Sequence, residues 1–64
     1  MKRYQLTLFA GEPDEQVVYA DLSEKDVEMI HKDMQGELNC QYCIALDNYE
    51  IIDVGIIDGI EEVK

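Results

Sequence analysis

Residues 23–36 read SEKDVEMIHKDMQG and carry the strongest local signal in the chain. Ser23 is a typical helix N-cap, and Asp26 stands where a carboxylate can bond back to the Ser23 backbone N–H, completing a capping box. Gly36 suits the left-handed backbone that ends many helices. This segment therefore predicts a helix over residues 24–35.

The spacing of apolar residues predicts which side of this helix is buried. An i, i+3, i+4, i+7 stripe faces a core, and it consists here of Val27, Ile30, His31 and Met34. Lys25 and Lys32 fall on the opposite side, so the helix is not a continuous negative ridge. We expect His31 to pack as a core residue rather than to act as a general base or a pH switch.

Two strands are predicted before the helix. Residues 4–9 and residues 16–22 each alternate apolar and polar side chains and are rich in strand formers. The turn-forming run Gly11-Glu12-Pro13-Asp14 separates them, which predicts a hairpin.

The second half of the chain predicts two further strands, followed by a last segment that fits more than one structure. Residues 38–46 alternate as a third strand, Asp47-Asn48 forms a turn, and residues 49–54 return as a fourth strand. Residues 56–60 are either a short fifth strand or an irregular tail. The predicted fold class is α+β, with a small antiparallel sheet of three to five strands and one helix on one face, in ββαββ order. One small acidic domain spans residues 1–64.

Length and composition bound this fold. A chain of 64 residues buries only about 60% of the surface that its unfolded form exposes, so small scaffolds gain stability from disulfides, a metal or oligomerisation. Apolar residues make up 47% of the chain, which argues against disorder. No apolar run is long enough for a signal-peptide core or a membrane span. We therefore expect a cytoplasmic protein with reduced thiols.

Charge is the main functional signal. The chain has fifteen Asp and Glu against five Lys and Arg, a formal net charge of -10, and no Lys or Arg between Lys32 and Lys64. Nucleic acids and anionic lipids need a positive footprint, so direct contact with either is not expected. A protein partner is expected instead, such as a basic nucleic-acid-binding protein. The predicted partner-binding residues are Glu12, Asp14, Glu15, Asp47, Glu50, Asp53, Asp58, Glu61 and Glu62.

Cys40 and Cys43 invite a zinc or redox interpretation, because two thiols at this spacing can share one metal or each other. In a strand, however, their sulfurs would point to opposite faces with backbones about 10 Å apart. We expect one buried and one partly buried free thiol. The alternative is a small zinc or redox protein, with zinc shared across a dimer and His31 as a further ligand. The acids do not follow the spacing of a calcium loop, and no catalytic residue, metal or cofactor is predicted.

Isoleucines predict a second contact surface. They stand on both faces of any strand they form, which one sheet with one helix cannot fully bury. We expect a homodimer through these residues, with a monomer whose tail covers the sheet as the alternative. The predicted interface residues are Ile51, Ile52, Ile56, Ile57 and Ile60.

These features favour a non-enzymatic, acidic protein-binding module, an accessory protein of a phage or mobile element that mimics nucleic acid. In size, acidic composition and the order strand, strand, helix, strand, residues 4–55 resemble the small phage-encoded inhibitors of uracil-DNA glycosylase. The resemblance concerns architecture and implies an inhibitor rather than an enzyme; it assigns no site residue. The zinc or redox protein and a structural homo-oligomeric subunit are the alternative functions.

Overall fold

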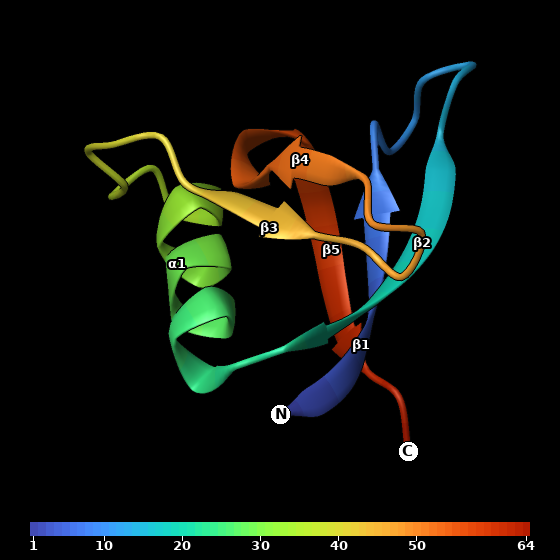
Figure 1. Cartoon of the computed structure of the whole chain (residues 1–64). Coiled ribbons are helices and arrows are strands. Elements are labelled where there is room, and N and C mark those ends of the chain that lie inside the picture. Colours follow the sequence, from blue (N-terminus) through green and yellow to red (C-terminus); the bar gives the residue numbers. More distant parts are fainter.

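A three-stranded antiparallel sheet is covered on one face by a helix and a two-stranded hairpin (Figure 1). The computed structural model describes all residues, 1–64. The strands of the sheet are β1 (Lys2–Leu8), β2 (Gln16–Leu22) and β5 (Ile57–Glu62), and their order is β2-β1-β5. The first and last strands therefore lie side by side, and the predicted α+β class is confirmed.

The first two strands form the predicted hairpin, in which β2 begins and ends at the predicted residues. The segment after Gly55, which the sequence left open, forms β5 and pairs with β1 from Tyr4↔Glu62 to Leu8↔Ile57. The register shifts between Thr7 and Leu8. Such a shift leaves one extra residue in β5, and this residue is Asp58.

The helix α1 spans Glu24–Met34, and its start follows the predicted capping box. The Asp26 N–H donates to Ser23 Oγ at 3.2 Å, and the Ser23 N–H donates to Asp26 Oδ2 at 3.1 Å. At the other end, Gly36 has a φ of 76°. The N–H of Gly36 donates to the carbonyl of Asp33, and the N–H of Glu37 donates to that of Lys32. These two bonds satisfy carbonyls that the helix leaves free.

The buried side of α1 differs from the predicted stripe. Ile30 is fully buried and Val27 is half-buried, but His31 is exposed and Met34 is 46% exposed. The prediction for His31 and Met34 was wrong because the helix turns its Asp33 side inward instead. Asp33 lies near Gly55, which belongs to a 3₁₀ turn over residues 54–56. The helix therefore packs partly against this turn rather than only on the sheet.

The covering hairpin consists of β3 (Cys43–Ala45) and β4 (Ile51–Asp53), both shorter than predicted. A 3₁₀ turn, η1 (Val54–Ile56), follows at once, and its Gly55 N–H donates to Asp53 Oδ1 at 2.7 Å. The last backbone bond across the hairpin runs from the Val54 N–H to the Tyr42 carbonyl at 2.9 Å, and the chain turns away there, so residues 38–41 have no strand beside them. The predicted strand over residues 38–46 is therefore limited to Cys43–Ala45, while the Asp47-Asn48 turn is confirmed.

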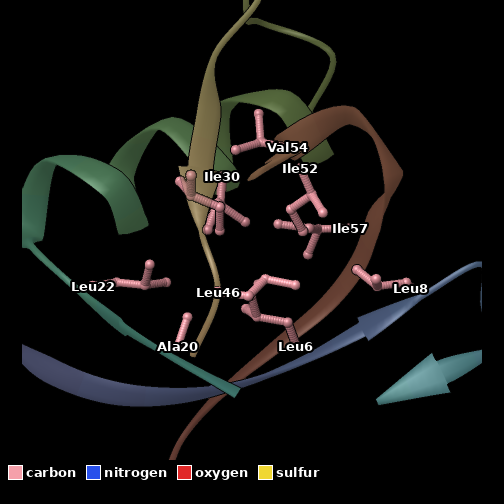
Figure 2. Close-up of a cluster of buried hydrophobic side chains, with 10 residues drawn as sticks. Leu6, Leu8, Ala20, Leu22, Ile30, Leu46, Ile52, Val54 and Ile57 are labelled. Carbon is pink, nitrogen blue, oxygen red and sulfur yellow. The ribbon is translucent and has the colours of Figure 1, made fainter. Parts of the chain in front are cut away.

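The core lies between the sheet and this covering layer (Figure 2). It consists of ten buried apolar residues, to which the sheet, the helix and the hairpin all contribute. The sheet side holds Leu6, Leu8, Ala20, Leu22 and Ile57, and the covering layer holds Ile30, Ile44, Leu46, Ile52 and Val54. The one α-helix is not long and apolar enough to cross a membrane.

Candidate functional site

The predicted acidic residues separate into three places on the molecule. The first is one end of the sheet, where the β1–β2 loop carries Glu12, Asp14 and Glu15. The Ala10 N–H donates to Asp58 Oδ2 at 2.8 Å, which holds this carboxylate beside the loop. We call Glu12, Asp14, Glu15 and Asp58 the acidic end. All four are exposed, and the four ion pairs of the chain involve other residues.

The acidic end is shaped by backbone bonds to its own carboxylates. The Gly11 N–H donates to Glu15 Oε1 at 3.0 Å, next to the bond between Ala10 and Asp58. Phe9 and Gly11 both have positive φ, 54° and 81°. This backbone aims neighbouring N–H groups at the acids, so the loop is held in one shape while its negative charge stays at the surface.

The C-terminal acids lie elsewhere. Glu61 and Glu62 pair with Gln5 and Tyr4 at the opposite end of the sheet from Asp58. Lys2 Nζ lies 3.6 Å from Glu62 Oε1. The structure does not bring these two acids together with the loop acids, and it supplies one of them with a partner base.

Asp47 is also paired, although the sequence placed it in a base-free segment. Arg3, the only arginine of the chain, bonds Asp47 through its two terminal guanidinium nitrogens, Nη1 and Nη2, and lies 3.5 Å from Asp21 Oδ1. The hydrogen bond with Asp47 raises the pKa of Arg3 further above its already high value, against the opposing effect of desolvation. The Asp47 N–H donates to the Tyr19 carbonyl at 3.2 Å. We call these contacts the Arg3 clamp; they fasten the hairpin turn to the edge of β2.

The third acidic place is the β3–β4 hairpin itself. Glu50 is exposed at its turn, where its N–H donates to Asn48 Oδ1 at 3.0 Å. Asp53 caps the 3₁₀ turn and is half-buried. Tyr49, directly before Glu50, is 90% exposed, and Ile51, between Glu50 and Asp53, is 63% exposed. The hairpin thus combines exposed apolar side chains with two carboxylates that make no ion pair.

One side-chain hydrogen bond joins the segment before β3 to the start of α1. Tyr42 Oη donates to Asp26 Oδ1 at 2.6 Å. Partial burial acts to raise the pKa of Asp26, but bonds from Tyr42 and Ser23 outweigh it and lower that pKa below its usual value. The bond to Asp26, followed by desolvation, raises the pKa of Tyr42. This pair has a structural explanation and needs no catalytic one.

Both cysteines are free and exposed, so the prediction of one buried and one partly buried thiol was wrong. Cys40 lies outside any strand, and the argument from strand alternation therefore does not apply to it. Cys43 pairs across the hairpin with Asp53. No group of three or more His, Cys, Asp or Glu side chains is placed to hold a metal ion. Zinc shared between two copies stays a prediction.

The five isoleucines predicted as a dimer interface have different surroundings. Ile52 and Ile57 are 7% and 2% exposed and belong to the chain's own core. Ile56 and Ile60 are half-buried against it, and only Ile51 is mostly exposed. The tail does not fold over a face of the sheet, as the monomer alternative expected, but joins the sheet as its third strand, β5. The homodimer stays a prediction, with Ile51, Ile56 and Ile60 as the residues that have surface to offer.

The surface has one hollow, of about 210 Å³, where the hairpin turn meets β2. Val18, Tyr19, Leu46, Asp47 and Asn48 line it. Pockets for small molecules usually measure about 300–1,000 Å³, so this hollow is below their range. No protein-family model, curated protein or solved structure matches the chain.

Two features of this surface were not predicted from the sequence. The Arg3 clamp joins residues 44 positions apart, and only the presence of a single arginine among so many acids could have singled it out. Tyr49 has a φ of 65°, which is uncommon for a bulky residue. Its place directly after Asp47-Asn48 was the available signal, because a residue that follows such a turn often takes the left-handed backbone.

Proposed function

We propose that this chain is a non-enzymatic binding module that places its acidic end on the basic nucleic-acid-binding surface of another protein. It would act as an inhibitor that mimics nucleic acid. The observation that carries the proposal is the bond from the Ala10 N–H to Asp58 Oδ2 (2.8 Å), which joins the acidic loop and β5 into one base-free end. We place the protein in the cytoplasm, where two exposed thiols stay reduced.

Electrostatics supports this partner class. A groove built to bind duplex DNA accepts one phosphate charge per about 1.7 Å of helix axis and is lined with Lys and Arg. Carboxylates held at the end of a rigid sheet can occupy part of such a groove, and the formal net charge of -10 attracts a basic partner from a distance. The Arg3 clamp and the Lys2–Glu62 pair reduce charge at other places and so concentrate it at the acidic end.

The test is displacement of DNA from basic proteins. A panel of them, including a uracil-DNA glycosylase, is bound to fluorescent duplex DNA, and anisotropy is followed as the chain is added at increasing NaCl. We expect displacement of DNA from at least one panel member at low salt, weakening as salt screens the carboxylates. Failure to displace DNA from any of them at low salt contradicts mimicry.

A matched pair of variants locates the effect. The triple change Glu12→Gln, Asp14→Asn and Glu15→Gln removes three charges from the acidic end. The control Glu24→Gln, Glu28→Gln and Glu37→Gln removes three charges from exposed positions of the helix region. We expect only the first to weaken displacement strongly. Equal losses would show that net charge, rather than the acidic end, is responsible.

A second candidate function rests on the exposure of both Cys40 and Cys43. Two copies would supply four thiolates, the donor set of a tetrahedral structural zinc site. This candidate expects one zinc per two chains by metal analysis of protein purified without chelator, and a dimer that dissociates when Cys43→Ser is introduced. Monomeric, zinc-free protein would rule it out.

A further inference from the structure

The β3–β4 hairpin carries apolar side chains on both of its faces, although Asp53 shares the outward one. Ile44 and Ile52 form a cross-strand pair that points into the core, as one face of such a hairpin should. The neighbouring pair, Ala45 and Ile51, points outward and is exposed. A solvent-facing position of a half-buried strand normally holds a polar residue. Ile51, at 63% exposure, does not contribute its full apolar surface to the fold.

Tyr49 adds a second exposed side chain at the turn of the same hairpin. It is 90% exposed and its φ is 65°. Glycine or asparagine takes this backbone at a lower cost than a bulky residue does. Because Tyr49 gains almost no burial in return, the fold itself does not favour tyrosine at this position. We call Ala45, Tyr49 and Ile51 the hairpin patch.

The charges around the hairpin patch indicate what can cover it. Glu50 and Asp53 flank it and make no ion pair, and Arg3, the base that contacts the hairpin turn, is already engaged by Asp47. A second copy would bring the same carboxylates against each other, and each copy carries a formal net charge of -10. A partner with an apolar groove and a rim of Lys or Arg complements both the side chains and the charges.

The hairpin patch is also held in place before any partner arrives. The Arg3 clamp fixes Asp47 to β1 and β2, and the opposite faces of β3 and β4 are anchored by Ile44 and Ile52 in the core. A rigid patch loses less conformational entropy on binding than a mobile loop would. Exposed Tyr and Ile on a fixed hairpin are therefore suited to act as anchors.

We propose that the hairpin patch is the apolar anchor through which this chain enters a Lys- and Arg-rimmed apolar groove of its protein partner. This inference rests on the proposed function, because it names the second, uncharged component of recognition of a basic protein. The acidic end then supplies long-range attraction, and Tyr49 and Ile51 supply the contacts that become buried.

Two synthetic probes separate these components. One is a short peptide of alternating lysine and leucine, and the other has the same length and charge with serine in place of leucine. Isotope-labelled protein is titrated with each and followed by NMR. We expect the lysine–leucine peptide to bind about tenfold more tightly and to shift the amide signals of residues 45, 49 and 51. The lysine–serine peptide should bind the acidic places by charge alone, Glu50 and Asp53 included, without this gain in affinity.

Two variants test the residues themselves. Ile51→Ser and Tyr49→Gly change exposed side chains, and Tyr49→Gly also suits the positive φ, so both proteins should fold; urea midpoints check this. Each should remove most of the advantage of the lysine–leucine peptide and leave lysine–serine binding unchanged. Equal binding of both peptides by the unchanged protein would overturn the hairpin inference while leaving the proposed function intact. If neither peptide binds at low salt, the proposed function fails. A dimer in sedimentation that Ile51→Ser dissolves would assign the patch to a second copy and overturn the inference.

Discussion

Replacing Ile30 with alanine tests how the helix is seated. Ile30 is the only fully buried residue of α1, at 0% exposure. The change removes three buried carbons at about 0.8 kcal/mol each, and the cavity left behind brings the expected loss to about 3–4 kcal/mol. A domain of this length has a free energy of unfolding of about 3–10 kcal/mol. Ile30→Ala should therefore remove a third or more of the stability.

The assay is urea unfolding followed by far-UV circular dichroism, with two controls on the same helix. His31→Ala and Met34→Ala change residues that the i, i+3, i+4, i+7 pattern assigns to the core but that the structure exposes. Each should cost less than about 1 kcal/mol. If Ile30→Ala leaves no folded baseline, Ile30→Val should lower stability by about 0.5–1.5 kcal/mol. The seating of the helix is refuted if either control costs as much as Ile30→Ala.

Three further changes test other contacts. Gly36→Ala forces a side chain into a φ of 76° and should lower the free energy of unfolding by about 1 kcal/mol. Gly55→Ala, at a position with ordinary φ, tests packing near Asp53 instead. A zero effect at Gly36 would contradict the helix end described above. Tyr42→Phe should raise the lowered pKa of Asp26 and reduce stability at neutral pH. A carboxylate whose pKa is lowered by folding stabilises the protein above its unfolded-state pKa, and this stabilisation is lost as pH falls through its folded-state pKa. The urea midpoints of the variant and the parent should therefore converge on acidification. A pH-independent difference between these midpoints would exclude this origin. Arg3→Gln should lower the melting temperature more than the charge-matched Lys25→Gln, and the difference should shrink as salt is added; equal melting temperatures would mean that the clamp does not stabilise the hairpin.

The sequence predicted those parts of the fold that local chemistry determines. The capping box of Ser23 and Asp26, the glycine end of the helix and the β1–β2 hairpin depend on neighbours a few residues apart, and all three are confirmed. The predicted rotation of the helix about its axis was wrong, because the four residues of the predicted stripe fit either of two adjacent sides of a helix this short. Which of these sides is buried depends on contacts with Val54 and the 3₁₀ turn, which lie far away in the chain.

The candidate site was less predictable for the same reason. The sequence identified the acids but could not show that Arg3 reaches Asp47, or that Asp58 bonds the loop after β1. Both contacts follow from the pairing of β1 with β5 and from the docking of the hairpin on β2. Tyr49 was unremarkable by residue type, and only its backbone angle and exposure distinguish it.

The neighbouring positions of β1 and β5 also constrain how the chain can fold. Residue 4 pairs with residue 62, so the central strand keeps one open edge until nearly the whole domain has been synthesised. The β1–β2 hairpin and α1 can form early from local contacts, but closing so long a loop is slow. A ribosome-bound intermediate would expose Leu6 and Leu8 beside an unpaired strand edge. The acids of the first loop follow β1 directly, and their mutual repulsion between nascent chains would limit aggregation during this interval.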